Sequence, residues 1–234
     1  MTKSISMVQL SKDFPDFKGL LGVPDQENAP GLLIIQEIFG INHVMHELVE
    51  HYTSLGYLTL CPDLFWRFQP GIVLDDRIAE DWKEASHYYQ HFSVDQGIED
   101  LKIGLNYLKN HDSCSGKVGS VGFCLGGRLA FLMSTRSDVD CSVSYYGVAL
   151  DQNLNEASQI KNPLLCHLAE LDQFVPAVVQ TQILKCFAGS RLVTCLQYKG
   201  MDHAFARKGG SHYNQQEAER ANQITQTFLQ THLR

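Results

Sequence analysis

Short apolar runs alternate along the chain with longer segments in which apolar residues recur every three or four positions. The runs predict buried strands at Leu32–Gln36, Tyr57–Cys61, Lys117–Phe123, Cys141–Tyr146, Pro163–Leu168 and Leu192–Tyr198. The stripes between them predict helices, and one of these stripes consists of Val44, Leu48, Tyr52 and Leu55.

Strands that are apolar throughout, each followed by a helix, indicate an α/β fold: a mostly parallel, twisted sheet with helices on both faces. No internal repeat or linker rich in Pro, Gly and Ser interrupts this rhythm, so we expect a single domain over residues 1–234. In such a sheet the ligand site lies at the carboxyl ends of the strands. The residues just after each predicted strand are therefore the candidates for chemistry.

The composition argues against several classes of partner. Asp and Glu outnumber Lys and Arg by 26 to 19, and no basic cluster occurs, so we expect no nucleic-acid partner. No apolar stretch approaches the roughly 18 residues of a membrane span, so we expect no membrane partner. The start of the chain has no apolar segment of secretion-signal length, which favours a cytoplasmic location.

The cysteines and histidines do not predict a metal site. Seven cysteines without a CxxC pair fit neither a disulfide framework nor a zinc ribbon, and they suit a reducing compartment. His43 with His46, and His87 with His91, are spaced like metal ligands, but no HExxH motif occurs. We interpret both pairs as solvated helix faces and expect no metal.

The segment Gly122–Gly126 reads GFCLG and fits the nucleophile elbow G-x-nucleophile-x-G, with the thiol of Cys124 as nucleophile. Glycines are needed because the nucleophile occupies a strained turn where other side chains would collide with strand and helix. The helix start favours a thiolate, and the N–H of Leu125 points to where an oxyanion would form. A dinucleotide-binding turn and a structural turn with an inert cysteine are the open alternatives, although G-x-G-x-x-G is absent.

The partners of such a nucleophile follow in the expected order, an acid and then a histidine, each after a strand. Asp172 comes 48 residues past Cys124, after the run PLLCHL, and His203 comes 31 residues later, after RLVTCLQY. His203 would relay protons, and Asp172 would fix its tautomer. Glu170 and Asp202 are rival acids, which we interpret as loop charges.

A fourth candidate is Glu37, at the end of the buried run LLIIQ. A carboxylate at the end of a central strand would lie next to the elbow, and a surface charge is the alternative. The same loop supplies a second oxyanion N–H in enzymes of this kind, here that of Ile38.

These residues and several further motifs resemble the dienelactone hydrolase family (carboxymethylenebutenolidases) of the α/β-hydrolase fold. The motifs are QEIFG at Gln36–Gly40, CPDL at Cys61–Leu64, GKVG at Gly116–Gly119, GFCLGG at Gly122–Gly127, YYGV at Tyr145–Val148, D-x-x-V-P at Asp172–Pro176 and H-x-F-A-R at His203–Arg207. The resemblance covers the chain from about Gly31 onward.

The resemblance implies that a Cys124–His203–Asp172 triad opens an enol lactone through a thiol ester, without a cofactor. It also implies that the thiol rests neutral while an arginine holds Glu37 away from the sulfur. An anionic substrate then competes for that arginine, and the freed carboxylate takes the thiol proton.

The family's substrate-carboxylate site matches this chain only in part. Arg207 matches one of two arginines that the family uses, whereas a gapless alignment over residues 62–101 places Trp82 at the other. Trp carries no charge and has one N–H, so it cannot replace a guanidinium. Arg77 would be rotated by about 140° from Trp82 on an ideal helix, so we expect it to face elsewhere.

Two further positions on the same wall also differ, since Ser86 and Tyr89 stand where the family has Tyr and Trp. With Trp82 they are spaced i, i+4 and i+7, on one face of a helix. Phe39 and Tyr145, within the matched motifs, complete the expected substrate contacts. We therefore expect an ester or lactone that is less anionic or more aromatic than dienelactone.

The sequence thus predicts a carboxylic ester hydrolase that acts on a small ester or lactone, as a monomer or weak homodimer. The alternative is a non-catalytic or thiol-sensing protein of the same fold, in which Cys124 responds to oxidants.

Overall fold

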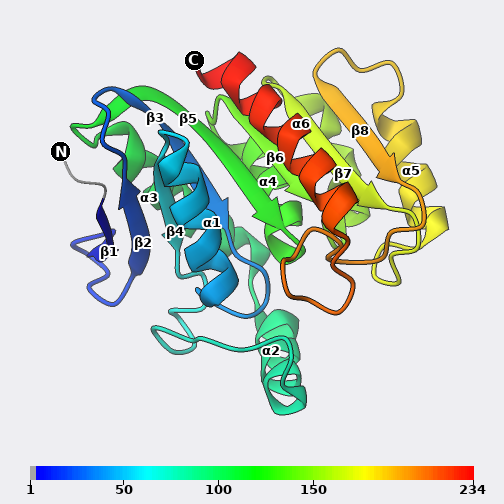
Figure 1. Cartoon of the computed structure of the whole chain (residues 1–234), viewed down its shortest axis with the longest axis horizontal. Coiled ribbons are helices and arrows are strands. Elements are labelled where there is room, and N and C mark those ends of the chain that lie inside the picture. Colours follow the sequence, from blue (N-terminus) through cyan, green and yellow to red (C-terminus); the bar gives the residue numbers. More distant parts are fainter. Residues whose placement is uncertain (1–3) are drawn as a thin grey trace. The chain divides into compact units, whose positions relative to one another are not determined.

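The computed structural model describes residues 4–234 (Figure 1). The strands are β1 (Ser4–Gln9), β2 (Lys18–Val23), β3 (Ala29–Ile35), β4 (Leu58–Pro62), β5 (Cys114–Phe123), β6 (Cys141–Tyr145), β7 (Leu164–Ala169) and β8 (Val193–Tyr198). The helices are α1 (His43–Ser54), α2 (Ala79–His91), α3 (Val94–Lys109), α4 (Leu125–Arg136), the 3₁₀ helix η1 (Leu150–Gln159), α5 (Ala177–Phe187) and α6 (Gln215–Leu233).

The chain divides into two compact units, one ending at Ser120 and the other covering Val121–Arg234, and β5 runs from the first into the second. In the first unit the strand order is β1-β2-β4-β3-β5, and in the second it is β5-β6-β7-β8. Strand β3 is parallel to β4, and β6, β7 and β8 are parallel to one another, whereas β1 and β2 are antiparallel. The predicted α/β fold with a mostly parallel sheet is confirmed. The single domain stays a prediction.

In the first unit, helices cover both faces of the sheet because side chains alternate along each strand. The hydroxyl of Thr59 in β4 lies 2.6 Å from that of Thr53 in α1. The next residue, Leu60, points the other way, towards Gly104 in α3. Helix α1 begins after Asn42, whose side chain accepts hydrogen bonds from the N–H groups of the first turn.

In the second unit, a buried polar network fastens α6 to the sheet. The hydroxyl of Thr225 in α6 lies 2.7 Å from the Tyr145 hydroxyl and 2.9 Å from Nε2 of His167. Nδ1 of His167 lies 2.8 Å from the Tyr198 hydroxyl, so the network joins β6, β7 and β8. Figure 1 shows α6 crossing one face of β6 and β7, with α4 on the other.

The six predicted strands correspond to β3 through β8, with ends shifted by a few residues. The sequence analysis missed the antiparallel pair β1 and β2, because most side chains of β1 are exposed and the apolar run of β2 is only Leu20 and Leu21 between two glycines. Within residues 4–234, no helix is long and apolar enough to cross a membrane.

Candidate active site

Cys124 occupies a strained turn between β5 and α4. Its backbone has φ 54° and ψ −114°, a combination that L-residues rarely adopt. Its N–H donates to the Tyr145 carbonyl at 3.1 Å, and its carbonyl accepts from Gly127 N at 3.0 Å and from Val148 N at 3.2 Å. Hydrogen bonds on both sides of the residue therefore hold the thiol at the carboxyl end of β5.

The glycines around Cys124 are required by backbone contacts. A Cβ on Gly122 would overlap the carbonyl of Gly126. A Cβ on Gly127 would lie 2.6 Å from the Tyr145 carbonyl, closer than real Cβ contacts come. Since backbone atoms cannot move aside as side chains do, the turn closes only with glycine, as the sequence pattern predicted.

His203 and Asp172 meet in the loops that follow β8 and β7. Nδ1 of His203 lies 2.7 Å from Oδ2 of Asp172, and both side chains are buried. The other oxygen of Asp172, Oδ1, accepts from Phe174 N at 2.8 Å and from Val175 N at 3.2 Å. The carboxylate is thereby fixed in orientation and fixes that of the imidazole in turn.

The charge state of His203 is set by Cys124 and Asp172. Burial alone would lower the pKa of His203. This effect is outweighed by the charge on Cys124, by hydrogen bonds to Asp172 and Cys124, and by the charge on Asp172, which together raise the pKa to about 10. The arrangement thus favours the protonated imidazole.

Two aromatic rings, which the sequence analysis did not single out, pack against His203. The ring centroids of Phe174 and Tyr146 lie 4.8 Å and 5.1 Å from that of the imidazole, both edge to face. Tyr146 has φ 39° and is fully buried, so it is also held by the fold. Its place inside YYGV, beside Tyr145, was the signal that could have found it.

Tyr145 itself points away from the thiol side. Its hydroxyl bonds to Asn222 and Thr225 in α6, and its ring stacks on Phe123 at 4.7 Å. What it offers Cys124 is its backbone carbonyl. A substrate contact by the Tyr145 side chain stays a prediction.

Leu125 and Arg207 lie in the same unit as Cys124. Leu125 is the first residue of α4, so its N–H has no carbonyl four residues earlier in the helix to bond to. Arg207 is only 7% exposed, and its N–H donates to Ala204, which has φ 61°. A substrate-binding role for Arg207 stays a prediction.

Glu37 and Ile38 belong to the first unit. Glu37 follows β3 by two residues and is 2% exposed, which removes the interpretation as a surface charge. The preceding side chain, Gln36, donates to the Glu37 carbonyl at 3.3 Å and accepts from Leu64 N at 3.1 Å, and so fixes this loop. The approach of Glu37 and Ile38 to Cys124 stays a prediction.

The three residues of the predicted wall lie on α2 and are all half-buried: Trp82, Ser86 and Tyr89. The Trp82 indole N–H donates to the Asp76 carbonyl at 2.5 Å, and the ring of Phe39 meets its ring at 5.0 Å. With its N–H occupied, the indole can offer a ligand carbon atoms but no hydrogen-bond donor.

Arg77 lies ahead of α2 rather than on it, so the helix rotation expected for it does not apply. Its side chain is exposed and pairs with Asp75 at 2.6 Å.

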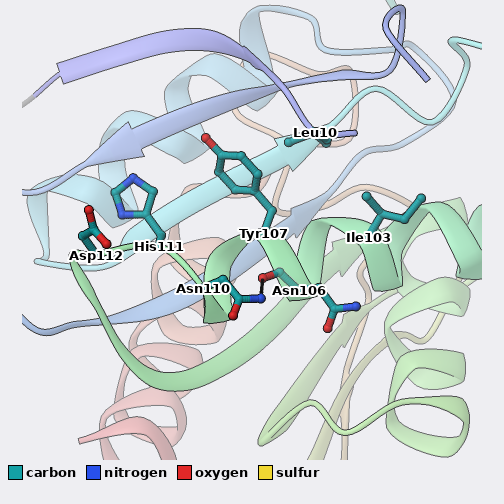
Figure 2. Close-up of a pocket in the computed structure, with 7 residues that line it drawn as sticks. All are labelled: Leu10, Ile103, Asn106, Tyr107, Asn110, His111 and Asp112. Carbon is teal, nitrogen blue, oxygen red and sulfur yellow. Dashed lines mark hydrogen bonds between the residues drawn. The ribbon is translucent and has the colours of Figure 1, made fainter. Parts of the chain in front are cut away.

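A hollow of about 500 Å³ lies in the first unit (Figure 2). It is lined by Leu10, Ile103, Asn106, Tyr107, Asn110, His111 and Asp112. None of the candidate catalytic or substrate-binding residues is among them. Among residues 4–234, no three His, Cys, Asp or Glu side chains are grouped to hold a metal ion.

Comparison with known proteins identifies the family. The family model "Dienelactone hydrolase family" matches residues 17–233. A relative from Azospirillum brasilense is 43% identical over 88% of each chain, and a Pseudomonas putida protein named carboxymethylenebutenolidase is 38% identical over 98% of this chain and 96% of its own. A solved structure from Klebsiella pneumoniae superposes with a TM-score of 0.83 at 20% identity, covering 96% of this chain and 97% of that one. The chain therefore belongs to the dienelactone hydrolase family.

Proposed function

We propose that the chain hydrolyses a carboxylic ester or lactone with Cys124 as nucleophile, His203 as general acid and base, and Asp172 as the group that orients His203. Family membership indicates a hydrolase acting on a lactone or ester. The residue assignment rests on His203, whose Nδ1 lies 2.7 Å from Oδ2 of Asp172 and whose pKa is raised in part by the charge on Cys124. An imidazole held in this way can pass a proton between sulfur and a leaving oxygen.

The first half-reaction forms a thiol ester. The Cys124 thiolate attacks the acyl carbon, a C–S bond forms, and negative charge develops on the carbonyl oxygen. The N–H groups of Leu125 and, by the family resemblance, Ile38 stabilise that oxyanion. His203 gives its proton to the alcohol oxygen as the C–O bond breaks, and in a lactone the alcohol stays attached to the acyl chain.

The second half-reaction restores the enzyme. Water attacks the thiol ester while His203 takes one of its protons. The C–S bond then breaks, which releases the carboxylic acid and returns the sulfur to its starting state. The net change is the addition of one water to the ester and involves no electron transfer, so the proposal calls for no cofactor.

Glu37 is proposed to handle the thiol proton when substrate binds. The resemblance implies that the thiol rests neutral and that the freed Glu37 carboxylate takes its proton, and the alternative is that His203 takes it. Alkylation of Cys124 by iodoacetamide, measured against pH in the wild type and in Glu37→Gln, separates the two. A changed profile supports a role for Glu37 in ionising the thiol, and identical profiles would remove Glu37 from the mechanism.

The proposed substrate is less anionic or more aromatic than dienelactone. Trp82 stands where the family has an arginine, and its indole N–H is occupied by the Asp76 carbonyl. With Phe39 edge-on to it, this part of α2 offers aromatic carbon and no charge. A hydrogen bond to a charged group contributes about 1.5–3 kcal/mol, so its loss weakens anion binding by roughly 10- to 150-fold.

Substitution of Trp82 tests this substrate preference. We expect Trp82→Arg to raise kcat/KM for dienelactone relative to a neutral aryl ester by about tenfold or more. Trp82→Phe is the matched control, because it keeps the aromatic wall and should keep the wild-type preference. Efficient turnover of dienelactone by the wild type, with negligible activity on aryl esters, would contradict the proposal.

Steady-state hydrolysis of an aryl ester tests the triad. Cys124→Ala and His203→Gln should each lower kcat/KM by at least about a thousandfold, because neither variant can complete the relay. Cys114→Ala, a half-buried cysteine at the far end of β5, is the control and should retain full activity. A thiol sensor would instead be labelled at Cys124 by the ester and release no further product.

A further inference from the structure

Three cysteines outside the proposed reaction lie on neighbouring elements of the second unit. Cys166 in β7 and Cys195 in β8 are directly opposite each other in the parallel ladder. Cys186 lies on α5, which packs against β8. None of the three belongs to a motif that the hydrolase chemistry uses.

Cys166 and Cys195 point to the same face of the sheet. Their neighbours Leu165 and Thr194 line a hollow with residues of α6, and successive side chains of a strand point to opposite faces. The two thiols therefore face away from α6. Adjacent strands lie about 4.8 Å apart. This spacing falls within the roughly 4.4–6.8 Å between Cα atoms that a disulfide spans.

The two thiols are chemically unequal. Cys166 is fully buried, Cys195 is half-buried and Cys186 is exposed. A hydrogen bond from Cys166 lowers the pKa of the Cys195 thiol against the opposing effect of burial. The same bond and burial raise the pKa of Cys166. Since the thiolate is the reactive form, Cys195 is suited to react first with an oxidant, and Cys166 is suited to react next with the oxidised Cys195.

We propose that Cys195 and Cys166 form a two-electron oxidation site for hydroperoxides, which closes a disulfide between β7 and β8. The Cys195 thiolate attacks one oxygen of hydrogen peroxide, the O–O bond breaks, and hydroxide leaves behind a sulfenic acid. The Cys166 sulfur, giving up its proton, attacks that sulfenic sulfur and displaces water. Overall, two thiols and one peroxide give one disulfide and two waters.

Tryptic digestion can test the pairing directly. Cleavage after Lys161, Lys185, Arg191 and Lys199 places Cys166, Cys186 and Cys195 in three separate peptides, 162–185, 186–191 and 192–199. The full chain carrying Cys124→Ser, so that the proposed nucleophile cannot consume peroxide, is treated with hydrogen peroxide. It is then alkylated under denaturing conditions and analysed by mass spectrometry.

We expect peptides 162–185 and 192–199 to be joined, with a loss of about 2 Da, while Cys61 and Cys141 remain alkylated. Cys186→Ser should leave this link intact, and Cys166→Ser should abolish it and leave Cys195 as a sulfenic acid that dimedone traps. A link between 186–191 and 192–199 as the main product would overturn the proposal. So would full alkylation of both Cys166 and Cys195 after treatment, with the protein shown to be folded by circular dichroism.

Discussion

At the scale of single residues, the turn at Cys124 is set by interactions between near neighbours in the sequence. Cys124 sits at φ 54°, a conformation that costs on the order of 1–3 kcal/mol, and bonds to Tyr145, Gly127 and Val148 maintain it. The motif GFCLG could predict this turn because a side chain in place of its first glycine would collide with the backbone of a near neighbour. The packing of Phe174 on His203 could not be predicted in this way, since the two residues come from separate loops.

The backbone collision at Gly122 leads to a first prediction. Gly122→Ala would press its Cβ into the carbonyl of Gly126, so we expect a loss of about 2–4 kcal/mol in the free energy of unfolding. Gly116→Ala, in the same strand, is the control: it has φ +90° with open space around it, and should cost about 1 kcal/mol. Urea denaturation measures both. Equal losses would show that Gly122 is not needed for close packing.

The pairing of His203 with Cys124 leads to a second prediction. With the pKa of His203 raised to about 10, the imidazole stays protonated between pH 6.5 and 9, so the alkylation rate of Cys124 should show no step from titration of His203 in that range. In His203→Gln the rate at pH 7 should fall by about tenfold or more, because the sulfur loses a neighbouring cation. Iodoacetamide kinetics against pH give both results. A step in the wild-type rate near pH 6.5, as expected of an ordinary histidine, would contradict the raised pKa.

At the scale of elements, β6, β7 and β8 are fastened together from the face that α6 covers. His167 bonds to Tyr198 and Thr225, and Thr225 bonds to Tyr145, whose carbonyl in turn holds Cys124. The three strands could be predicted because they are apolar runs, but the network could not, since its partners are as many as 80 residues apart. The pair β1 and β2 was missed because β1 is mostly exposed and β2 has only a short apolar run.

The buried network leads to a third prediction, on stability against pH. Burial lowers the pKa of His167 from 6.5 to about 3, so between these values the unfolded chain binds a proton that the folded chain does not. The contribution of His167 is therefore fully present above pH 6.5 and is lost progressively as the pH falls towards 3. At pH 4.5 the loss amounts to about 2–3 kcal/mol, at 1.36 kcal/mol for each pH unit.

The matched variant for this third prediction is His167→Gln, which keeps polar atoms but does not titrate. Both proteins lose stability in acid as carboxylates protonate, so the informative quantity is the difference between their losses. Urea unfolding at pH 7 and pH 4.5 should show a larger loss for the wild type by about 2–3 kcal/mol. Equal losses would mean that His167 is not a buried neutral group.

At the scale of the whole molecule, the residues of the proposed triad and those of the proposed substrate wall belong to different units. Cys124, His203 and Asp172 all lie within Val121–Arg234, whereas Glu37 and Trp82 lie before Ser120. The meeting of Asp172 and His203 could be predicted because each follows one of two adjacent parallel strands, β7 and β8, and such strands end at one edge. The setting of Trp82 could not be predicted, since its indole N–H bonds to the Asp76 carbonyl in the segment ahead of α2.

The central claim is that Cys124 carries the acyl group during turnover. The most direct test mixes the enzyme with a neutral aryl ester, stops the reaction in acid within milliseconds, and maps the tryptic peptides by mass spectrometry. The account predicts an acyl group on Cys124 that appears before steady-state product and disappears when substrate runs out. Hydrolysis at the wild-type rate with no acylated Cys124, or in the Cys124→Ala variant, would contradict it.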